Sequence, residues 1–380
     1  MADPLDNILS PESEDDEGAD ADSTHTSLTS ITSSVLYGVI GEGQRTYAAY
    51  GKEEYGFPMD DRELDRMDLC HSMYYALLDK RRFLAPVTKN PQRILDIGCG
   101  TGIWAVDVAD QYPSAEVESQ SSLAVAEREH VTHEGQVVGV DIAPTQPDWV
   151  PPNCSFELDD IEQPWTWKES TADLIVGRDL FLSVRDFPRL IDQCYRCDAV
   201  SPSSCVLDYI HLPLMSRHLK PGGWLELQCV TGIVMCDDGT VPKDSAYQRM
   251  GDSVGRACAK FGTPVDDPQR WQGWMRERGF EGVEEEVFKL PCAPWAVDKR
   301  LKLVGMWEQH QLLNNVDGMI MRLFHKALGW TEQEITVFGA MFRKDLRDLS
   351  MHAYFPYYVV YGRKPPYAQL WGSTGEVKDI

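Results

Sequence analysis

Short apolar runs alternate with longer polar or amphipathic stretches through the middle of the chain. Each run has the length of a buried β-strand and is bounded by turn residues or by helical spacing. The runs cover residues 93–97, 137–141, 155–161, 172–176 and 224–227. Strands that alternate with helical segments are typical of a parallel sheet built from βαβ units. The pattern therefore predicts an α/β fold.

Helical spacing flanks this region. Residues 60–84 carry apolar side chains at helical intervals, which predicts a helix packed across the sheet. Further helices are expected at 247–261, 268–278 and 295–350, and further strands at 283–290 and 353–361. The helices of 295–350 are rich in Trp, Met and Phe, which suits either a cap over a substrate pocket or ordinary helix packing. Pro221, Gly222 and Gly223 predict a turn between a helix end and the fifth strand.

Four parts of the chain follow from these patterns. Residues 1–34 hold nine acidic residues, no Lys or Arg and few large apolar groups, so a disordered acidic tail is expected. An N-terminal helical segment (35–90), a main α/β domain (91–365) and a C-terminal tail (366–380) complete the predicted order.

Charge and cysteine content narrow the class of protein. The chain has 380 residues and a formal net charge of −24, which disfavours direct binding to nucleic acid. Of ten cysteines only Cys194 and Cys197 form a CxxC pair, so we expect free thiols and no metal site. No apolar run reaches the length of a membrane span, and no basic secretion signal begins the chain. We expect a soluble protein of the cytoplasm, with the nucleus as a second location.

The clearest chemical signal is a glycine loop. Asp96 lies inside the first apolar run, and Gly98, Gly100 and Gly102 follow before residues 103–106 begin a helix. Glycines in a strand–loop–helix turn let the backbone approach a bound nucleotide closely. The dinucleotide fingerprint spaces its glycines differently. Alternate glycines behind an acid in the strand favour S-adenosylmethionine (SAM) as cofactor, with the carboxylate of Asp96 facing its cationic amino-acid end.

Two later acids extend the expected SAM site. Asp141 ends the second strand, where a carboxylate can accept hydrogen bonds from both ribose hydroxyls. Asp160 follows the third strand and is placed to bond the adenine amino group, while Ile161 covers the ring. The segments stand in the order of a methyltransferase sheet. The sequence thus predicts a Rossmann-like class I methyltransferase sheet with N-terminal helices and a helical cap insertion before the last strand.

From about residue 37 to residue 365 the chain resembles the fungal LaeA-like methyltransferases, class I SAM enzymes associated with secondary metabolism. The matching stretches are residues 44–50, 65–71, 95–104, 149–154, 162–167, 218–228 and 352–365. By position in that family, His71 and Tyr47 are the candidates for a catalytic base. For His71 a packing or capping role is the alternative. We expect His218 to be structural and Arg178 to pair with Asp179 or Asp186.

Two segments depart from the family pattern. The ribose acid Asp141 stands 39 residues after Gly102, whereas the family places it about twenty residues on, as suits short βα units. The extra residues lie near 118–136, and a second extra segment covers 197–217. Retained introns in the gene and two genuine surface loops are the competing explanations, which sequencing of the transcript separates.

Two functions fit this sequence. One is an enzyme that methylates oxygen, nitrogen or carbon of a small-molecule intermediate in fungal secondary metabolism. The other is a LaeA-like nuclear regulator that acts through protein partners, with the acidic tail as the docking segment. The tail favours the regulator, whereas the lack of a Lys/Arg cluster resembling a nuclear localisation signal favours the enzyme. A degenerate SAM-binding module is disfavoured because the glycines and the three acids are all present.

Overall fold

The computed structural model describes residues 37–51, 54–113, 136–165, 172–195 and 218–366. The predicted acidic tail, almost all of the two extra segments and the C-terminal tail from residue 367 lie outside the described residues. Gln136, which we placed at the end of the first extra segment, is the first residue of a strand instead. Among the described residues, no helix combines the length and the apolar character that crossing a bilayer requires.

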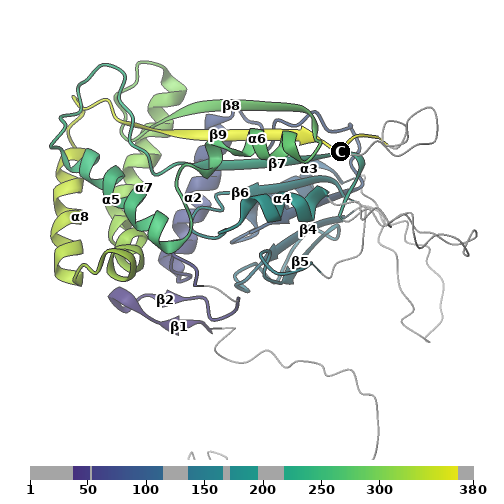
Figure 1. Cartoon of the computed structure of the whole chain (residues 1–380), viewed down its shortest axis with the longest axis horizontal. Coiled ribbons are helices and arrows are strands. Elements are labelled where there is room, and N and C mark those ends of the chain that lie inside the picture. The colour runs from purple at the N-terminus through teal and green to yellow at the C-terminus, as the bar shows by residue number, and fades with distance from the viewer. Residues whose placement is uncertain (1–36, 52–53, 114–135, 166–171, 196–217, 367–380) are drawn as a thin grey trace, which may run out of the picture. The chain divides into compact units, whose positions relative to one another are not determined.

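A seven-stranded sheet carries the fold, in the order β5-β4-β3-β6-β7-β9-β8 (Figure 1). Its strands are β3 (Arg93–Ile97), β4 (Gln136–Asp141), β5 (Cys154–Leu158), β6 (Ala172–Arg178), β7 (Leu219–Val230), β8 (Glu281–Pro291) and β9 (Tyr354–Arg363). Strands β3 to β7 run parallel, whereas β9 is antiparallel to both β7 and β8. The strand order reverses at β3, where open α/β sheets bind their ligands. The predicted Rossmann-like α/β fold is confirmed.

Alternate residues of β3 show how the sheet is covered on both faces. Ile94 belongs to a core with Trp104 of α3 (Ile103–Gln111). Leu95 belongs to a core with Leu190 of α4 (Phe187–Tyr195) and Trp271 of α6 (Trp271–Glu277). A short 3-10 turn, η3 (Asp267–Gln269), leads into α6. Burial on both faces explains why these strands are nearly continuous apolar runs.

Two local predictions were wrong. Residues Lys220–Gly223 do not form a turn before the fifth strand, because Leu219 already pairs with Ala172 and the four residues bulge inside β7. Two backbone hydrogen bonds with Lys364 hold the bulge. The N–H of Lys364 donates to the carbonyl of Gly223, and the carbonyl of Lys364 accepts from the N–H of Gly222. The N-terminal helix α2 (Asp61–Leu77) ends before residue 84, because residues 79 and 80 adopt left-handed backbone conformations.

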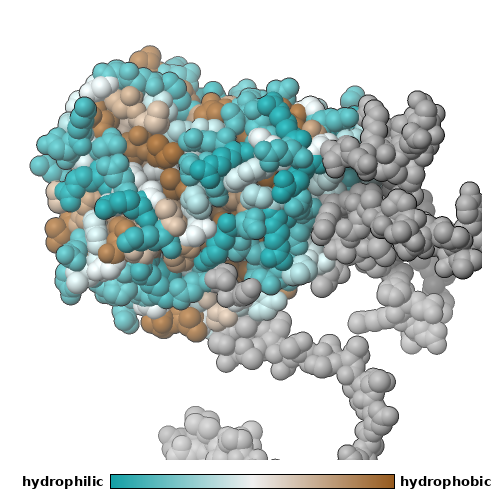
Figure 2. Space-filling model, in the orientation of Figure 1, coloured by the Kyte–Doolittle hydropathy of each residue, from teal (hydrophilic) through white to brown (hydrophobic). Residues whose placement is uncertain are grey.

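Helices gather at the carboxyl ends of the parallel strands. They are α5 (Ala246–Phe261), α7 (Lys299–Leu323), the π-helical turn η4 (Phe324–Leu328) and α8 (Glu332–Leu346), and together with α2 they share one apolar core. The face shown in Figure 2 carries hydrophobic patches over these helices and is mostly hydrophilic over the sheet. Strand β8 ends and β9 begins at paired residues, Pro291 and Tyr354, so the α7–α8 insertion leaves and re-enters the sheet at one point. The predicted helical insertion is confirmed.

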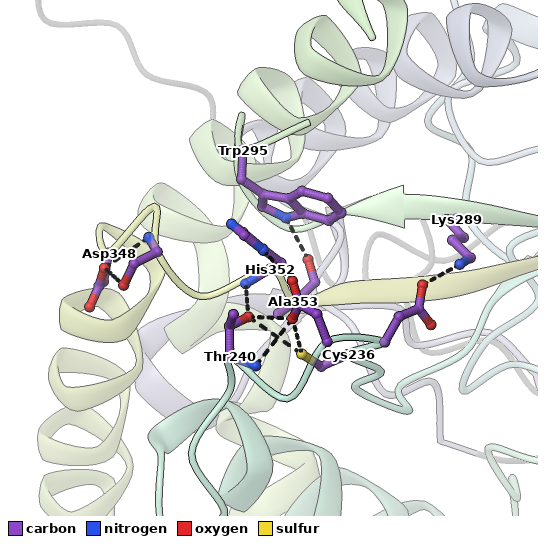
Figure 3. Close-up of polar contacts among 10 residues, drawn as sticks. Cys236, Thr240, Lys289, Trp295, Asp348, His352 and Ala353 are labelled. Carbon is purple, nitrogen blue, oxygen red and sulfur yellow. Dashed lines mark hydrogen bonds and ion pairs between the residues drawn. The ribbon is translucent and has the colours of Figure 1, made fainter. Parts of the chain in front are cut away.

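Side-chain contacts fasten the chain on either side of this insertion (Figure 3). The backbone N–H of His352 donates to the Thr240 hydroxyl at 2.9 Å, and its ring Nδ1 lies 2.6 Å from the Asp238 carboxylate. The indole N–H of Trp295 donates to the carbonyl of Ala353 at 2.9 Å. These bonds tie the loop after β7 and the start of the insertion to the segment that enters β9.

The N-terminal segment lies against α7. It forms a two-stranded ribbon of β1 (Val39–Ile40) and β2 (Thr46–Tyr47) joined by η1 (Glu42–Gln44). Arg322 of α7 donates to the Glu42 carboxylate at 2.8 Å and to the carbonyl of Tyr55 at 3.2 Å. Its guanidinium also stacks 3.4 Å from the centre of the Tyr47 ring. One buried arginine thus holds three points of this segment.

Candidate active site

The glycine loop joins β3 to α3 in a conformation that suits glycine. Gly98, Gly100 and Gly102 all have positive φ angles, of 70°, 56° and 77°. The amides of Gly98 and Cys99 donate to the carbonyl of Val140 in the neighbouring strand at 2.8 and 2.9 Å. A Cβ on Gly100 would lie 2.2 Å from the terminal methyl of Met67, and one on Gly98 2.4 Å from Leu180. The loop is therefore fixed against β4 and leaves no room for larger residues.

Asp141, at the end of the neighbouring strand β4, binds the backbone of the glycine loop through its carboxylate. One of its carboxylate oxygens accepts from the amide of Gly100 at 2.7 Å, and the other accepts from the amide of Ala143 at 3.1 Å. Asp160 accepts from the amide of Glu162 at 3.0 Å, beside the buried Ile161. Both carboxylates line the same cavity as Gly98 and Gly100. The structure thus brings together most of the residues predicted for the cofactor, from three consecutive strand ends.

Two predicted cofactor residues lie elsewhere. Gly102 does not line the cavity, because the Phe156 ring covers it. Asp96 is 1% exposed inside β3 and does not line the cavity either. One of its oxygens has no hydrogen-bond partner among the described residues, and burial raises the pKa of Asp96 to about 7. Asp96 therefore lies beneath the loop as a buried acid.

Two side-chain nitrogens at the cavity wall, the Nε of Arg178 and the Nδ1 of His71, have no hydrogen-bond partner among the described residues. The Nε of Arg178, at the end of β6, is buried without a hydrogen-bond partner, and its guanidinium stacks on Trp104 at 5.5 Å. No bond to Asp179 or Asp186 is present among the described residues, so the expected pairing of Arg178 was wrong. His71 on α2 lies 3.1 Å through Nε2 from Asp107, and its buried Nδ1 is unpaired.

Neither predicted base has the properties of an ordinary one. Burial and the nearby Arg178 lower the pKa of His71 to about 4, so its imidazole is neutral near pH 7. Tyr47 does not line the cavity; its hydroxyl donates to the carbonyl of Glu42, and burial raises its pKa to about 12. His218 packs on Trp165 with ring centres 4.8 Å apart, which fits the structural role expected for it.

The cavity has a volume of about 230 Å³ and continues from the loop into the helices. Its far part is walled by α2, α5, α7 and α8, and most of that wall is apolar. The apolar side chains there include Met67, Met250, Val254, Leu312, Val316, Ile320 and Phe342. Asp179, expected only as a partner of Arg178, also lines this part, and sequence reasoning missed three further polar groups there, Arg66, Glu308 and Gln311. For the last two a signal existed, since both lie on the apolar face of α7.

The described residues fit SAM as a cofactor. A glycine cradle that a Cβ would fill, two carboxylates at successive strand ends and a guanidinium with one buried, unpartnered nitrogen all border one cavity in the described part of the chain. A fold and site of this kind define a class I SAM-dependent methyltransferase. Among the described residues no group of three or more His, Cys, Asp or Glu side chains is placed to hold a metal ion.

Comparison with known proteins agrees with this class. The methyltransferase domain family matches residues 69–285. Methyltransferase pytC of Aspergillus terreus is 35% identical over 342 residues, 90% of this chain and 93% of that protein. Secondary metabolism regulator LAE1 of Cochliobolus heterostrophus is 30% identical, over 85% of this chain and 94% of that protein. Protein-methionine methyltransferase laeA of Emericella nidulans is 28% identical, over 85% and 76%. The chain belongs to this methyltransferase family, and its resemblance to the LaeA-like methyltransferases is confirmed.

Proposed function

We propose that the chain transfers the methyl group of SAM to a small organic molecule, an intermediate of fungal secondary metabolism. The observation that carries this proposal is the single cavity that joins the glycine loop to an apolar chamber under the cap helices. Ligand pockets for small molecules are largely apolar with a few placed polar groups. The similarity to a secondary metabolism regulator and to a fungal methyltransferase supports the metabolic setting.

For the cofactor end we propose a role for each group at the strand ends. Gly98, Gly100 and Gly102 shape the cradle, Asp141 accepts the ribose hydroxyls, Asp160 bonds the adenine amino group and Ile161 covers the ring. Arg178 binds the carboxylate of the methionyl part, since its Nε is buried and unpaired at the cavity wall. The free Nδ1 of His71 accepts from the methionyl ammonium. Asp96 supplies negative charge from beneath the loop.

The reaction chiefly requires that the acceptor be held in the right position next to the methyl group of SAM. Bound SAM supplies an activated methyl group on a sulfonium, so holding the acceptor in line and excluding water supply much of the rate. The apolar walls of α5, α7 and α8 exclude water from the chamber. A general base is most effective when its pKa lies near the working pH. With a pKa of about 4, His71 is a weak base, so its role toward the cofactor is favoured over the catalytic role predicted for it.

Methyl transfer in an extract tests this function. The purified full chain is incubated with SAM labelled in its methyl group and an organic extract from a strain that lacks the gene. We expect label in one or a few small molecules and none in protein. Arg178→Leu is expected to weaken binding of S-adenosylhomocysteine (SAH) at least tenfold, because an ionised partner of the carboxylate is lost. Label in protein alone would contradict the proposal.

The second candidate is a LaeA-like regulator of secondary metabolism genes. Its supporting observation is the 30% identity to LAE1 over nearly the whole of both proteins. In that case the acceptor is a protein, the acidic residues 1–34 dock a partner, and the chain works in the nucleus rather than the cytoplasm. Gene deletion separates the two. Loss of one family of metabolites supports the enzyme, whereas loss across many unrelated families supports the regulator.

A further inference from the structure

Helix α7 carries two polar side chains into an otherwise apolar chamber. Glu308 and Gln311 are each 3% exposed, stand one turn apart and both line the cavity. Their neighbours on the same wall are apolar, among them Leu312, Val316 and Ile320. Burial of a carboxyl and an amide at an apolar wall is costly unless both find partners. The hydrogen-bond partners of these two side chains therefore decide what the pair does.

The partners found within the protein leave this pair incomplete. The Gln311 amide lies where one of its two N–H groups favours the ionised Glu308 carboxyl and partly offsets the rise in the pKa of Glu308 that burial causes. The Oε1 atom of Gln311 is buried with no hydrogen-bond partner among the described residues. An unpaired buried acceptor in a native protein points to a missing donor. Because the unpaired atom is a carbonyl oxygen, the missing group must be a donor.

Groups from other elements do not supply that donor. The charge of Arg66 on α2 favours ionised Glu308, but its side chain donates to Glu63 at 2.8 Å and to the Cys70 sulfur at 3.2 Å. Asp179, at the end of β6, faces Glu308 with negative charge and binds Tyr74 instead. A ligand in the chamber is therefore the natural source of the donor.

We propose that Glu308 and Gln311 are specificity-determining residues that bind an O–H or N–H group of the methyl acceptor. This inference rests on the proposed small-molecule function and narrows it. The acceptor is then a largely apolar molecule that carries at least one hydrogen-bond donor. An analogue without that donor leaves the Oε1 atom of Gln311 unpaired and binds more weakly.

A matched pair of probes tests this. The full chain is saturated with SAH, and its affinity for 2-naphthol and for 2-fluoronaphthalene is measured by calorimetry. The two probes have nearly the same shape, but only the first has an O–H group. We expect 2-naphthol to bind at least about tenfold more tightly, since an unmet buried hydrogen bond costs of that order. In Gln311→Leu and in Glu308→Gln the preference should fall to about twofold or less.

Exposed residues provide the controls. Gln333→Leu on α8 and Glu284→Gln on β8 make the same chemical changes at the surface and should keep the wild-type preference. Unchanged SAH affinity shows that each variant is folded with its cofactor site intact. Equal affinity of the wild type for both probes, absence of binding of either probe, or a preference kept in both α7 variants would overturn the assignment. None of these outcomes touches methyl transfer in the extract, so the proposed function is tested separately.

Discussion

Buried carboxyl groups are an unusual feature of this site and its support. Burial raises the pKa of Asp96, Glu226 and Glu308 to about 7 in each case. Their surroundings differ. Glu226 accepts hydrogen bonds from the amides of Leu84 and Ala85 and from Gln228, whereas one oxygen of Asp96 has no partner. A buried acid with few donors costs stability when it ionises, which a site for a cationic cofactor can use.

The stability of the SAM-free protein should therefore fall with pH through Asp96. Folding raises the pKa of Asp96 from the ordinary carboxyl value to about 7. At pH values between these two, the folded state therefore holds a proton that the unfolded state has lost. Stability is lost as the pH rises through that window, by up to about 1.4 kcal/mol per pH unit for one proton. Asp96→Asn removes this contribution, so urea unfolding between pH 5 and pH 8 should show a flatter slope. The exposed Asp244→Asn is the control, and equal slopes for wild type and Asp96→Asn would refute the argument.

Gly100 allows a sharp test of the cradle. Alanine there meets a positive φ angle and the Met67 methyl, so the loop must shift. A left-handed conformation costs an alanine about 1–2 kcal/mol. We expect Gly100→Ala to weaken SAH binding at least tenfold while the chain stays folded, as measured by calorimetry and circular dichroism. Gly273→Ala in α6, where nothing lies within 4 Å of the new methyl, should leave SAH affinity unchanged and raise stability slightly. Unaltered binding in Gly100→Ala would mean that the cofactor does not use this loop.

At the level of elements, Arg322 joins α7 to the N-terminal segment. The side chain of Arg322 is 8% exposed, and that of its partner Glu42 is 14% exposed. Breaking a largely buried pair by removing one partner typically costs about 3–5 kcal/mol, because the other charge stays buried. Arg322→Met is expected to destabilise the chain by about 3 kcal/mol and to speed proteolysis of residues 37–60. Exposed Lys344→Met on α8 should do neither. If the segment stays equally protected, the arginine contacts do not hold it.

The elements that the sequence predicted well are those set by local pattern. Apolar runs such as 137–141 and 172–176 form strands because both faces of the sheet are covered, and Gly98 to Gly102 bend where only glycine fits. The bulge at residues 220–223 was missed because it depends on Lys364, more than 140 residues away. Glu308 and Gln311 lie on the apolar face of α7, but they were missed because only helix packing shows that this face lines the cavity.

At the level of the whole molecule, the described residues that flank each of the two extra segments are linked by side-chain contacts. Asn153 accepts from Val137 at the start of β4 and donates to the carbonyl of Tyr112 after α3. Likewise the Lys364 ammonium lies 5.4 Å from the centre of the ring of Tyr195, the last residue of α4, and donates to the carbonyl of Leu219 at the start of β7. These contacts hold the residues on the two sides of each segment together without help from the segment itself. We therefore expect that a short connection could replace each segment.

Deletion of residues 118–134 and 197–217 should thus leave a folded methyltransferase. We expect SAH affinity within about twofold of the full chain and stability within about 1 kcal/mol, because loop length contributes little to stability. Calorimetry and thermal unfolding measure both. As a matched control, deletion of the exposed turn around Gly239 should fail, because Thr240 anchors the chain before β9. Loss of SAH binding in the shortened chain would show that at least one extra segment is part of the working protein.

The pairing of Pro291 with Tyr354 has a consequence for the history of the family. Residues 292–353 leave and re-enter the sheet at one rung of the ladder, where Pro291 pairs with Tyr354, so changes within this stretch need not shift the register of β8 or β9. Substitutions in residues 292–353 can therefore alter the proposed acceptor chamber without shifting the strands that hold the glycine loop. Chimeras in which this stretch is exchanged between relatives are expected to take the acceptor preference of the protein that donates it. The sequences of the relatives should differ most in this stretch.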